Sequence, residues 1–345
     1  MNKQNVFLFA GQGCQYHHMG EELMNGNDTF RKTMKRLDDK AHQLIGSSVI
    51  DYIYDPDKGR SQPFDRLLYS HPAIFMVQFA MAQALIESGI KPHRVCGYSL
   101  GECVAAAVSK VADPLDILTT VINQARLVEA TIPEGGMLVI LADPVLYYQV
   151  PLLYTRTTLV GVKVREKHKQ FVVAATKDSL VEVKNYLTEN NITCHQLPVL
   201  YPYHSHHMDV LQDAYNAMLG TPEYNRPEVP FVSSIYGCEL NKIDRQYWWD
   251  LIREPILFQE AIQYLEGYDA NLYIDLSPSG EFASYINLLK LEGASSQVHT
   301  ILNLWKRDGV RNMEKIVSEM SYGHDENIDK YSENVGIRLG SMSYE

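Results

Sequence analysis

The sequence predicts an α/β protein: a parallel sheet covered by helices on both faces, with a smaller module inserted into it. Apolar strand-like segments alternate with longer helical segments near both ends of the chain, which is typical of parallel sheets. Residues 135–203 follow a different order, namely strand, helix, strand, strand, helix, strand. A serine flanked by glycines, Ser99, stands between a short apolar run and an alanine-rich run, as at a sharp turn from strand to helix.

The N-terminal part begins with a strand and continues in helices. The apolar run 6–10 ends in the glycine loop 11–15, so we expect a fully buried parallel strand there. The helix expected over 72–86 is apolar along its whole length, so it should be buried and deliver the chain to the strand before Ser99. The other helices expected in this part are 28–45, capped by Asp28, and a long helix that Asp113 caps with Pro114 at its first position.

The middle of the chain has the β-α-β-β-α-β order of a ferredoxin-like module. After residue 204 the alternation of strands and helices resumes, and the last 25 residues are polar and lack periodicity. We therefore expect a large subdomain of residues 1–134 and 204–320, a ferredoxin-like small subdomain of 135–203, and a flexible tail of 321–345. The strands expected in the module are 137–141, 158–164, 171–175 and 193–200, and those expected after it are 231–236, 272–276 and 299–302. The helices expected in these two parts are 144–153, 179–189, 209–218, 244–253, 259–265, 281–289 and 312–319.

The composition places the chain among soluble globular proteins. Its 345 residues are 46% hydrophobic and 21% charged, which is ordinary for such a protein. A net charge of −11 argues against nucleic acid as a partner. The five cysteines lack a CxxC pair and fit reduced thiols in the cytoplasm. No signal peptide precedes the first strand, and no apolar run approaches the roughly 18 residues of a membrane span. No metal, nucleotide or flavin motif appears, so no cofactor is expected.

The stretch GYSLG at 97–101 has the G-x-S-x-G pattern of a nucleophile elbow. The two glycines suit a turn so sharp that a Cβ would clash with neighbouring backbone. Such a turn lifts the Ser99 hydroxyl into solvent at the end of a strand. It also directs the Leu100 amide and a helix N-terminus at an oxyanion forming there. Without a partner base, however, the same pattern would be an ordinary turn from strand to helix.

A serine needs a base within hydrogen-bond reach, and the segment 201–209 offers three histidines at the junction of the inserted module and the main body. This segment could instead be an exposed loop, or the three histidines could hold a metal. A further alternative is the chain order of α/β-hydrolases, in which Ser99 would be followed by Asp275 and His299. The candidate histidines of the junction are His204, His206 and His207.

Four motifs in the same order resemble the malonyl-CoA:acyl-carrier-protein acyltransferase family, which includes the acyltransferase domains of polyketide synthases. The resemblance covers roughly residues 4–315 and implies a large α/β-hydrolase-like subdomain with a ferredoxin-like small one. FAGQGCQ at 9–15 resembles the family motif GQGSQ, and GYSLGE at 97–102 resembles GHSLGE. YPYH at 201–204 stands where the family has a specificity motif that ends in the catalytic histidine. IDLSPSG at 274–280 resembles EVGPG.

The resemblance implies a Ser99–His204 dyad in which the serine attacks a thioester and the histidine moves its proton. It also implies an oxyanion hole made by the amides of Leu100 and Gln12. The family orients its histidine with a backbone carbonyl, which we expect from Leu257 in the segment 254–258. The substrate-binding residues implied in the same way are Tyr98, Gln124, Tyr201, Tyr203 and Leu257.

One departure from the family bears on substrate choice. Members that load malonyl groups clamp the substrate carboxylate with an arginine, and the matching position here is Gln124. Arg126 should point away, because two residues along a helix turn by about 200°. A slip of the alignment that presents Arg126 instead remains the alternative. Two further departures are Tyr98, where the family has histidine, and 165–168, where it has an NSP loop. The pocket is therefore expected to reject malonyl and accept neutral acyl groups.

This combination resembles the discrete acyl hydrolases of trans-acyltransferase polyketide synthases, which release acyl groups from carrier proteins. A trans-acting acyltransferase that loads a malonyl or neutral acyl group is the alternative, and a silent docking subunit is a third. The expected partner is an acyl-carrier protein, the expected substrate an acyl-phosphopantetheine or acyl-CoA, and the expected state a monomer. An acidic carrier needs basic residues, which the chain offers at 163–169 and at Lys306, Arg307 and Arg311.

Overall fold

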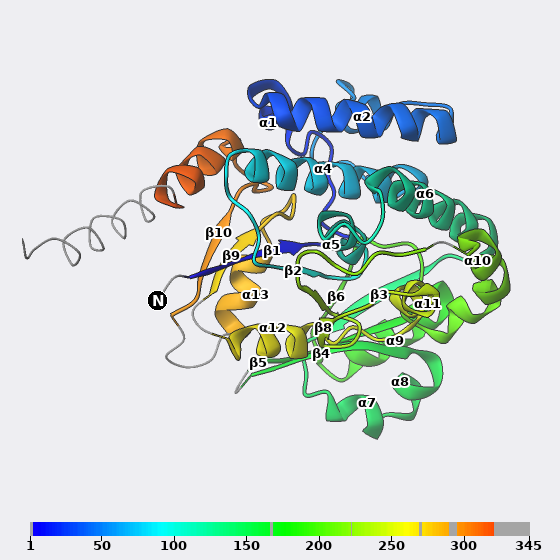
Figure 1. Ribbon diagram of the computed structural model, residues 1–345. Helices are drawn as coiled ribbons and strands as arrows, with labels where there is room; N and C mark the ends of the chain where they lie inside the picture. The colour runs from blue at the N-terminus through cyan, green and yellow to red at the C-terminus, as the bar shows by residue number, and fades with distance from the viewer. Residues whose placement is uncertain (1–2, 166–167, 222, 269–270, 290–294, 321–345) are drawn as a thin grey trace, which may run out of the picture.

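The computed structural model describes residues 3–165, 168–221, 223–268, 271–289 and 295–320. Its strands form two separate sheets, and long helices cover the larger one (Figure 1). This is the predicted α/β architecture. The tail expected over 321–345 lies outside the described residues, and so do residues 166 and 167 of the predicted loop at 165–168.

Within the described residues, six strands form the larger sheet in the order β10-β9-β1-β2-β7-β8. All adjacent pairs are parallel except β7 and β8, so the predicted parallel sheet is confirmed with one exception. The strand expected over 231–236 stops at Ser233, because the chain turns back at Gly237, where φ is 69°. The strands are β1 (Gln4–Phe9), β2 (Arg94–Gly97), β7 (Phe231–Ser233), β8 (Cys238–Leu240), β9 (Asn271–Asp275) and β10 (Gln297–Thr300).

Helices cover both faces of this sheet, with α1, α2, α4 and α6 above it in Figure 1 and α12 and α13 below. Asp113 caps α6 as predicted, since its side chain accepts from the Leu115 amide. The cap of α2 is Asn27 rather than Asp28, because the Asn27 side chain accepts from the Phe30 amide. The helices of this body are α1 (Glu21–Gly26), α2 (Asp28–Ile45), α3 (Val49–Ile53), α4 (Leu67–Glu87), α5 (Gly101–Val108), α6 (Pro114–Thr131), α10 (Gln212–Leu219), α11 (Arg245–Arg253), α12 (Phe258–Glu266) and α13 (Phe282–Leu289), with a 3₁₀ turn over His206–Leu211 and helical residues 309–320.

The buried helix α4 begins at Leu67, five residues before the expected start at Pro72. Proline favours the first helical position, but here it lies inside the helix. The added first turn is supported by Glu129, whose carboxylate accepts from the Leu68 amide. The early start has a consequence for the pocket described below, because it places His71 in the helix with only 2% of its surface exposed.

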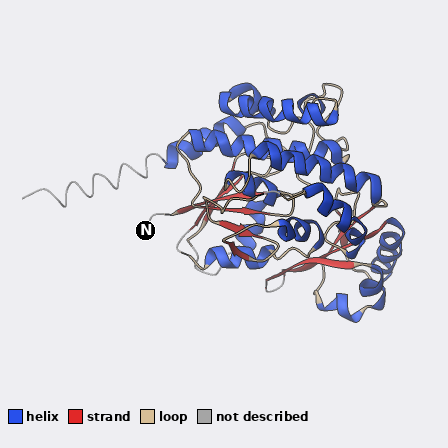
Figure 2. Ribbon diagram, turned by 45° about the vertical axis from the view of Figure 1, so that its right-hand side comes forward, coloured by secondary structure: helices blue, strands red, loops and turns tan. Residues whose placement is uncertain are grey.

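The smaller sheet is antiparallel, with the order β4-β5-β3-β6. Numbered within the module, this order is 2-3-1-4, which is the ferredoxin-like arrangement predicted from the sequence. The helix expected over 144–153 is two short helices, because Pro151 begins a new one. Figure 2 shows strands and helices of both sheets in separate colours. The elements of the small module, labelled in Figure 1, are β3 (Gly135–Ile140), β4 (Thr158–Arg165), β5 (His168–Thr176), β6 (Cys194–Gln196), α7 (Val145–Gln149), α8 (Pro151–Arg156) and α9 (Lys177–Glu189).

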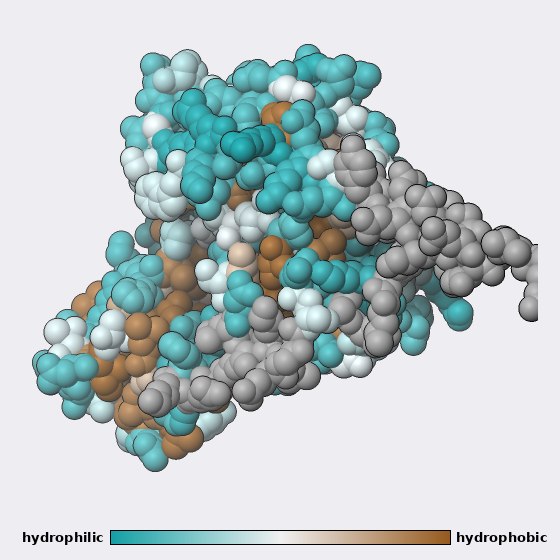
Figure 3. Space-filling view, turned by 90° about the vertical axis from the view of Figure 1, so that its left-hand side faces the viewer, coloured by the Kyte–Doolittle hydropathy of each residue, from teal (hydrophilic) through white to brown (hydrophobic). Residues whose placement is uncertain are grey.

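The small sheet takes part in two hydrophobic cores. One face packs under its own helices, with Leu138 and Phe171 among the buried residues. The other face contributes Met137, Val160 and Ala174 to the core of the main body. Figure 3 shows hydrophilic residues over the upper part of one face of the molecule and hydrophobic residues gathered lower down. None of the helices that the structure describes is both long and apolar enough to cross a membrane.

Candidate active site

Ser99 lies at the turn between β2 and α5, in a left-handed conformation with φ of 52°. Non-glycine residues rarely adopt this conformation, and it is held by close packing on both sides. A Cβ on Gly97 would come within 2.2 Å of the Glu102 nitrogen, and one on Gly101 within 2.1 Å of the Phe9 oxygen. The two glycines therefore permit the tight elbow that the sequence predicts.

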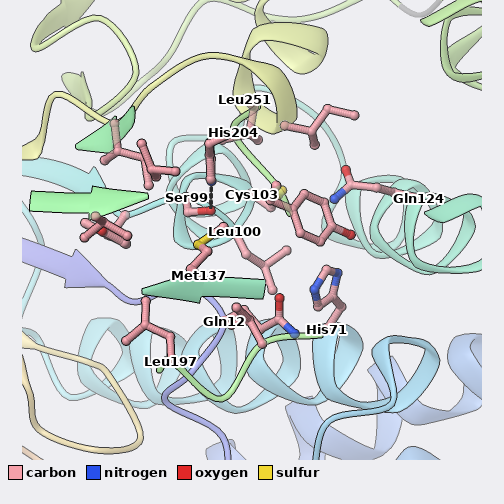
Figure 4. A pocket seen from close by; sticks show the side chains of 17 residues that line it. Gln12, His71, Ser99, Leu100, Cys103, Gln124, Met137, Leu197, His204 and Leu251 are labelled. Carbon is pink, nitrogen blue, oxygen red and sulfur yellow. Dashed lines mark hydrogen bonds between the residues drawn. The ribbon is translucent and has the colours of Figure 1, made fainter. Parts of the chain in front are cut away.

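The Ser99 hydroxyl lies 2.7 Å from Nε2 of His204, and Figure 4 shows the two side chains facing each other. The other ring nitrogen, Nδ1, is 2.9 Å from the carbonyl oxygen of Glu254. A carbonyl can only accept, so Nδ1 carries the proton and Nε2 is left to accept from the serine hydroxyl. The predicted pair thus meets in the geometry that proton transfer from serine requires.

The carbonyl that orients His204 belongs to Glu254, so the prediction of Leu257 is wrong. The Leu257 carbonyl begins α12, where it accepts from the Ala261 amide. The Leu257 carbonyl thus belongs to the first turn of a helix, whereas the imidazole bonds the Glu254 carbonyl three residues earlier. The Leu257 side chain is 37% exposed and does not line the pocket described below.

His204 is almost completely buried, with 2% of its surface exposed. Burial lowers its pKa to about 4, against a smaller effect of the Glu254 carbonyl, which stabilises the protonated ring. The ring is therefore neutral at physiological pH and ready to accept a proton. Its backbone is also held, because the His204 amide donates to the Ile252 carbonyl at 2.9 Å.

Glu102 directly follows the elbow and is fully buried. Its carboxylate accepts hydrogen bonds from Ser233, from Ser234 and from the Tyr247 hydroxyl. Burial raises its pKa to about 7, although these hydrogen bonds oppose the rise. The Ser234 carbonyl in turn accepts from the Leu257 amide. Glu102 therefore links the serine helix to the segment that carries the carbonyl beneath His204, a role that the sequence did not predict.

The loop after β1 packs directly against the elbow. A Cβ on Gly11 would lie 2.7 Å from the Tyr98 carbonyl oxygen and 3.1 Å from the Ser99 Cβ, so only glycine allows this approach. The loop is fixed by Gln78 of α4, which bonds both the amide and the carbonyl of Ala10, at 2.6 and 2.9 Å. Because Ala10 and Gly11 are held in this way, Gln12 lies at the edge of the site.

The amides of Leu100 and Gln12 are the predicted oxyanion donors. Within the part of the chain that the structure describes, neither amide donates to another protein group. Both residues line the same pocket as Ser99. Neither N–H group is therefore committed to another partner in the described part of the chain, and their role as an oxyanion hole stays a prediction.

The Ser99–His204 pair opens into a pocket at the junction of the two sheets, about 610 Å³ in volume with its mouth included. Tyr98, Gln124 and Tyr203 line it as predicted, whereas Tyr201 does not. The sequence did not predict the many apolar residues that form its walls, because they come from separate elements of both parts of the chain. They include Met137, Val160, Leu197, Val199, Leu251 and Ile256.

Gln124 occupies the position expected to replace the arginine clamp. It is 4% exposed, and its Oε1 accepts from the Tyr215 hydroxyl at 3.0 Å. Arg126 is exposed and donates to the Leu44 carbonyl at 2.8 Å, so the alternative in which it enters the pocket is wrong. Among the described residues, no arginine, lysine or carboxylate lines the pocket.

The structure does not assemble the other sites that the sequence left open. Asp275 accepts from amides of its own loop, and His299 faces Glu319 at 3.7 Å, so these two do not form a triad with Ser99. His206 bonds the Thr158 hydroxyl. Among the described residues no group of three or more His, Cys, Asp or Glu is placed to hold a metal.

A histidine that the sequence analysis did not single out also lines the pocket. His71 has no hydrogen-bond partner at either ring nitrogen within the described residues, although it is 2% exposed. Burial lowers its pKa to about 3, so the ring is neutral. The only signal in the sequence was its place beside Pro72, and that proline was interpreted as the start of the helix.

Residues 6–329 match the acyl transferase domain family. The chain is 40% identical over 289 residues to the polyketide biosynthesis acyltransferase homolog PksD of Bacillus subtilis (strain 168). The matched region covers 84% of this chain and 88% of the relative. It is 39% identical over 308 residues to the homolog BaeD of Bacillus velezensis, which covers 89% of this chain and 94% of the relative.

Solved structures show the same fold at lower identity. The acyl transferase domain of SpnD, in complex with 2-(pent-4-yn-1-yl)malonyl, has a TM-score of 0.82 at 24% identity and covers 94% of this chain and 78% of that one. MCAT from Streptococcus pneumoniae has a TM-score of 0.74 at 23% identity, and the match covers 90% of this chain and 100% of that one. With the match over 6–329 and two relatives near 40% identity, the chain belongs to the acyl transferase domain family.

Proposed function

We propose that this protein is an acyl-carrier-protein thioesterase that removes neutral acyl groups through an acyl-serine intermediate. The observation that carries the proposal is the pocket beside the Ser99–His204 pair, in which no described side chain bears a charge. A buried carboxylate without a partner is strongly disfavoured. Malonyl and methylmalonyl groups should therefore be poor substrates, and uncharged acyl groups should be good ones.

The proposed reaction has two halves that share one intermediate. His204 takes the proton of the Ser99 hydroxyl as the serine oxygen attacks the thioester carbon. The amides of Leu100 and Gln12 stabilise the oxyanion, and losing one such donor typically costs about 10²–10³ in rate. His204 then protonates the leaving thiol. In the second half, His204 activates a water that attacks the acyl-serine, which releases the free acid and restores the serine. The reaction needs no cofactor.

The setting we propose is polyketide biosynthesis, since PksD and BaeD are named as polyketide biosynthesis acyltransferase homologs. The partner would be an acidic acyl-carrier protein. In the run 163–169, Lys163 lies over the Tyr285 ring and Lys169 pairs with Asp143, so these charges are already engaged. In the second basic segment Arg307 faces Glu21 at 3.8 Å, but Lys306 and Arg311 form no ion pair within the described residues, which favours this segment as the carrier contact.

The family membership itself supports a second candidate, an acyltransferase that passes a neutral acyl group to a carrier thiol. Both reactions share the acyl-serine and differ only in the acceptor, water or thiol. A silent docking subunit has less support, because the hydrogen-bonded Ser99–His204 pair and its orienting carbonyl are intact.

One experiment separates these candidates. The protein is incubated with acetyl-loaded and malonyl-loaded carrier protein, and the intact masses of protein and carrier are followed. Hydrolysis predicts loss of acetyl from the carrier with little loss of malonyl. An acyl-enzyme that discharges only onto an unloaded carrier would identify a transferase instead. A protein that is never acylated would contradict both, and Ser99→Ala supplies the control for acylation at that residue.

The uncharged pocket predicts that Gln124→Arg increases acceptance of malonyl groups. The new guanidinium would face the substrate carboxylate, and the Tyr215 hydroxyl keeps an acceptor in the Trp248 carbonyl. We expect the malonyl-to-acetyl ratio of Ser99 acylation to rise by tenfold or more, on the order of one charge-assisted hydrogen bond. Gln124→Leu is the matched control, since it alters the amide without adding charge. A ratio unchanged in Gln124→Arg would contradict the placement of Gln124 beside the acyl group.

A further inference from the structure

The pocket has a second polar region besides the Ser99–His204 pair. Figure 4 shows His71 and Gln124 on the side of the pocket away from that pair, and both residues line it. Tyr203 contacts both: its ring centroid is 5.7 Å from that of His71, and its hydroxyl interacts with the Gln124 side chain. The rest of the lining in this part of the molecule is largely apolar.

Polar atoms of two side chains in this region, His71 and Tyr203, lack a well-formed hydrogen bond within the described residues. Both nitrogens of His71 are buried and form no hydrogen bond within the described residues. The buried Tyr203 hydroxyl lies beside the Gln124 amide without a hydrogen bond of good geometry, and because Gln124 Oε1 accepts from Tyr215, the Tyr203 O–H is left to donate. The two side chains are 2% and 6% exposed. Buried groups of this kind are almost always paired, because leaving them unpaired costs free energy. Two such residues facing one pocket indicate a ligand group that completes their hydrogen bonds.

The chemistry of the region selects the kind of group. A neutral imidazole offers one N–H donor and one acceptor nitrogen, and a tyrosine hydroxyl both donates and accepts. Burial keeps both uncharged, because it lowers the pKa of His71 and raises that of Tyr203. A carboxylate would find no cation here, and an alkyl chain would leave the polar atoms unpaired. A hydroxyl can accept from one of these side chains and donate to another at the same time.

We propose that His71 and Tyr203 bind a hydroxyl group on the acyl chain, so that the preferred substrates are hydroxyacyl thioesters. The inference rests on the proposed function, because it takes the acyl group to extend from Ser99 into this pocket. It makes the two residues determinants of specificity rather than participants in the bond-breaking steps.

The test measures acylation of Ser99, which does not depend on whether water or a thiol follows. The probes are N-acetylcysteamine thioesters of butanoic, 3-hydroxybutanoic, 3-oxobutanoic, hexanoic, 3-hydroxyhexanoic and 5-hydroxyhexanoic acids, with both enantiomers of each alcohol. Rapid quenching and intact mass give the acylation rate constants. We expect at least one hydroxyacyl probe to react about tenfold faster than its unsubstituted parent, which is the size of one net hydrogen bond. We expect the 3-oxo probe to gain less.

Tyr203→Phe removes the hydroxyl and keeps the ring, so it should bring the tenfold preference down to about threefold or less, and His71→Phe should do the same. Tyr147→Phe is the matched control. Its hydroxyl donates to the Thr157 carbonyl, neither residue lines the pocket, and Tyr147 belongs to the separate core under the helices of the small sheet, so the preference should stay at the wild-type value. The melting temperatures add a second readout: Tyr147→Phe loses a satisfied hydrogen bond and should melt lower, whereas Tyr203→Phe should not.

The outcomes keep this inference separate from the proposed function. If Ser99 is acylated but the hydroxyl probes show no preference, or if the preference survives in both Tyr203→Phe and His71→Phe, the hydroxyl site is overturned and the thioesterase proposal stands. Tyr203→Phe melting as low as Tyr147→Phe would also overturn it, because the hydroxyl would then already be paired. A hydroxyl preference in acylation without any hydrolysis would support the site and contradict the thioesterase.

Discussion

At the scale of single residues, the state of His204 decides whether the site can begin its reaction. The Glu254 carbonyl fixes the proton on Nδ1, and burial keeps the ring neutral, so Nε2 faces the Ser99 hydroxyl as a free acceptor. A carbonyl does this work without adding a negative charge. The histidine therefore lacks the carboxylate that raises the pKa of the base in Ser-His-Asp triads.

This environment predicts an unusual pH dependence for acylation of Ser99. The reactive form of His204 is neutral, and its pKa is lowered to about 4, so the neutral fraction falls only as the pH drops through about 4. We expect the acylation rate to be flat between pH 5.5 and 7.5. A free histidine with a pKa near 6.5 would instead lose about tenfold in rate by pH 5.5. Stopped-flow measurements with an acyl thioester test this, with circular dichroism confirming the fold at each pH. An inflection near pH 6.5 would contradict the burial argument.

At the scale of elements, Glu102 joins α5 to the turn after β7. One oxygen of its carboxylate accepts from the amides of Ser234 and Ile235, and the other from Tyr247. The same turn receives the Leu257 amide, close in sequence to the carbonyl beneath His204. The serine and the histidine are thus positioned through one buried carboxylate that touches neither.

Glu102→Ala should lower stability by ~3 kcal/mol, because it leaves several buried donors without an acceptor. Glu102→Gln is the matched variant and should cost ~1 kcal/mol, since the amide oxygen can still accept from the two backbone amides. Urea unfolding measures both values. Equal losses in the two variants would mean that the hydrogen bonds contribute little.

The difference in stability between the wild type and Glu102→Gln should also change with pH, in a direction that the pKa of Glu102 sets. Burial raises the folded-state pKa of Glu102 to about 7, above its ordinary value of 4.5, so the wild type is most stable below pH 4.5 in this respect and loses stability as the pH rises toward 7. Glu102→Gln has no proton to lose. The difference in unfolding free energy, wild type minus Glu102→Gln, should therefore fall by up to ~1.4 kcal/mol per pH unit between pH 4.5 and 7, and reach the ~1 kcal/mol given above at pH 7. Urea unfolding at pH 5 and pH 7 checks this, and a gap that widens would contradict it.

Most elements could be predicted from the sequence because their signals are local. The glycines around Ser99, the cap at Asp113 and the βαββαβ order each act over a few residues, and all three appear in the structure. The errors arose where distant residues decide. Glu129 supports the extra first turn of α4, and the choice of Glu254 over Leu257 depends on where α12 begins. The walls of the pocket were beyond prediction for the same reason, because they come from elements far apart in the chain.

At the scale of the whole molecule, the pocket lies where the small sheet meets the main body. The Val160 carbonyl of β4 accepts from the Ile256 amide, and the Gln259 side chain bonds both the amide and the carbonyl of Val164. The edge strand of the small sheet is therefore attached to the segment that leads into α12. Val160 and Ile256 also line the pocket.

Gln259→Ala should loosen this attachment, because it removes two hydrogen bonds between α12 and β4. We expect faster hydrogen exchange at the Val164 amide, by about tenfold, which corresponds to the loss of roughly one net hydrogen bond. Gln263→Ala, on the exposed side of the same helix, is the control. Exchange at Val164 that is equal in the two variants would show that the side chain of Gln259 does not hold the strand.

The bond between Val160 and Ile256 bears on any attempt to build chimeras from members of this family. Ile256 stands two residues after Glu254, whose carbonyl sets the proton on the catalytic imidazole proposed here. A small subdomain transplanted alone would bring a foreign β4 against a native 254–257 segment and would shift that carbonyl. A transplant intended to change acyl selectivity should therefore include residues 254–257. The new pocket residues would then be introduced together with the backbone carbonyl that orients His204.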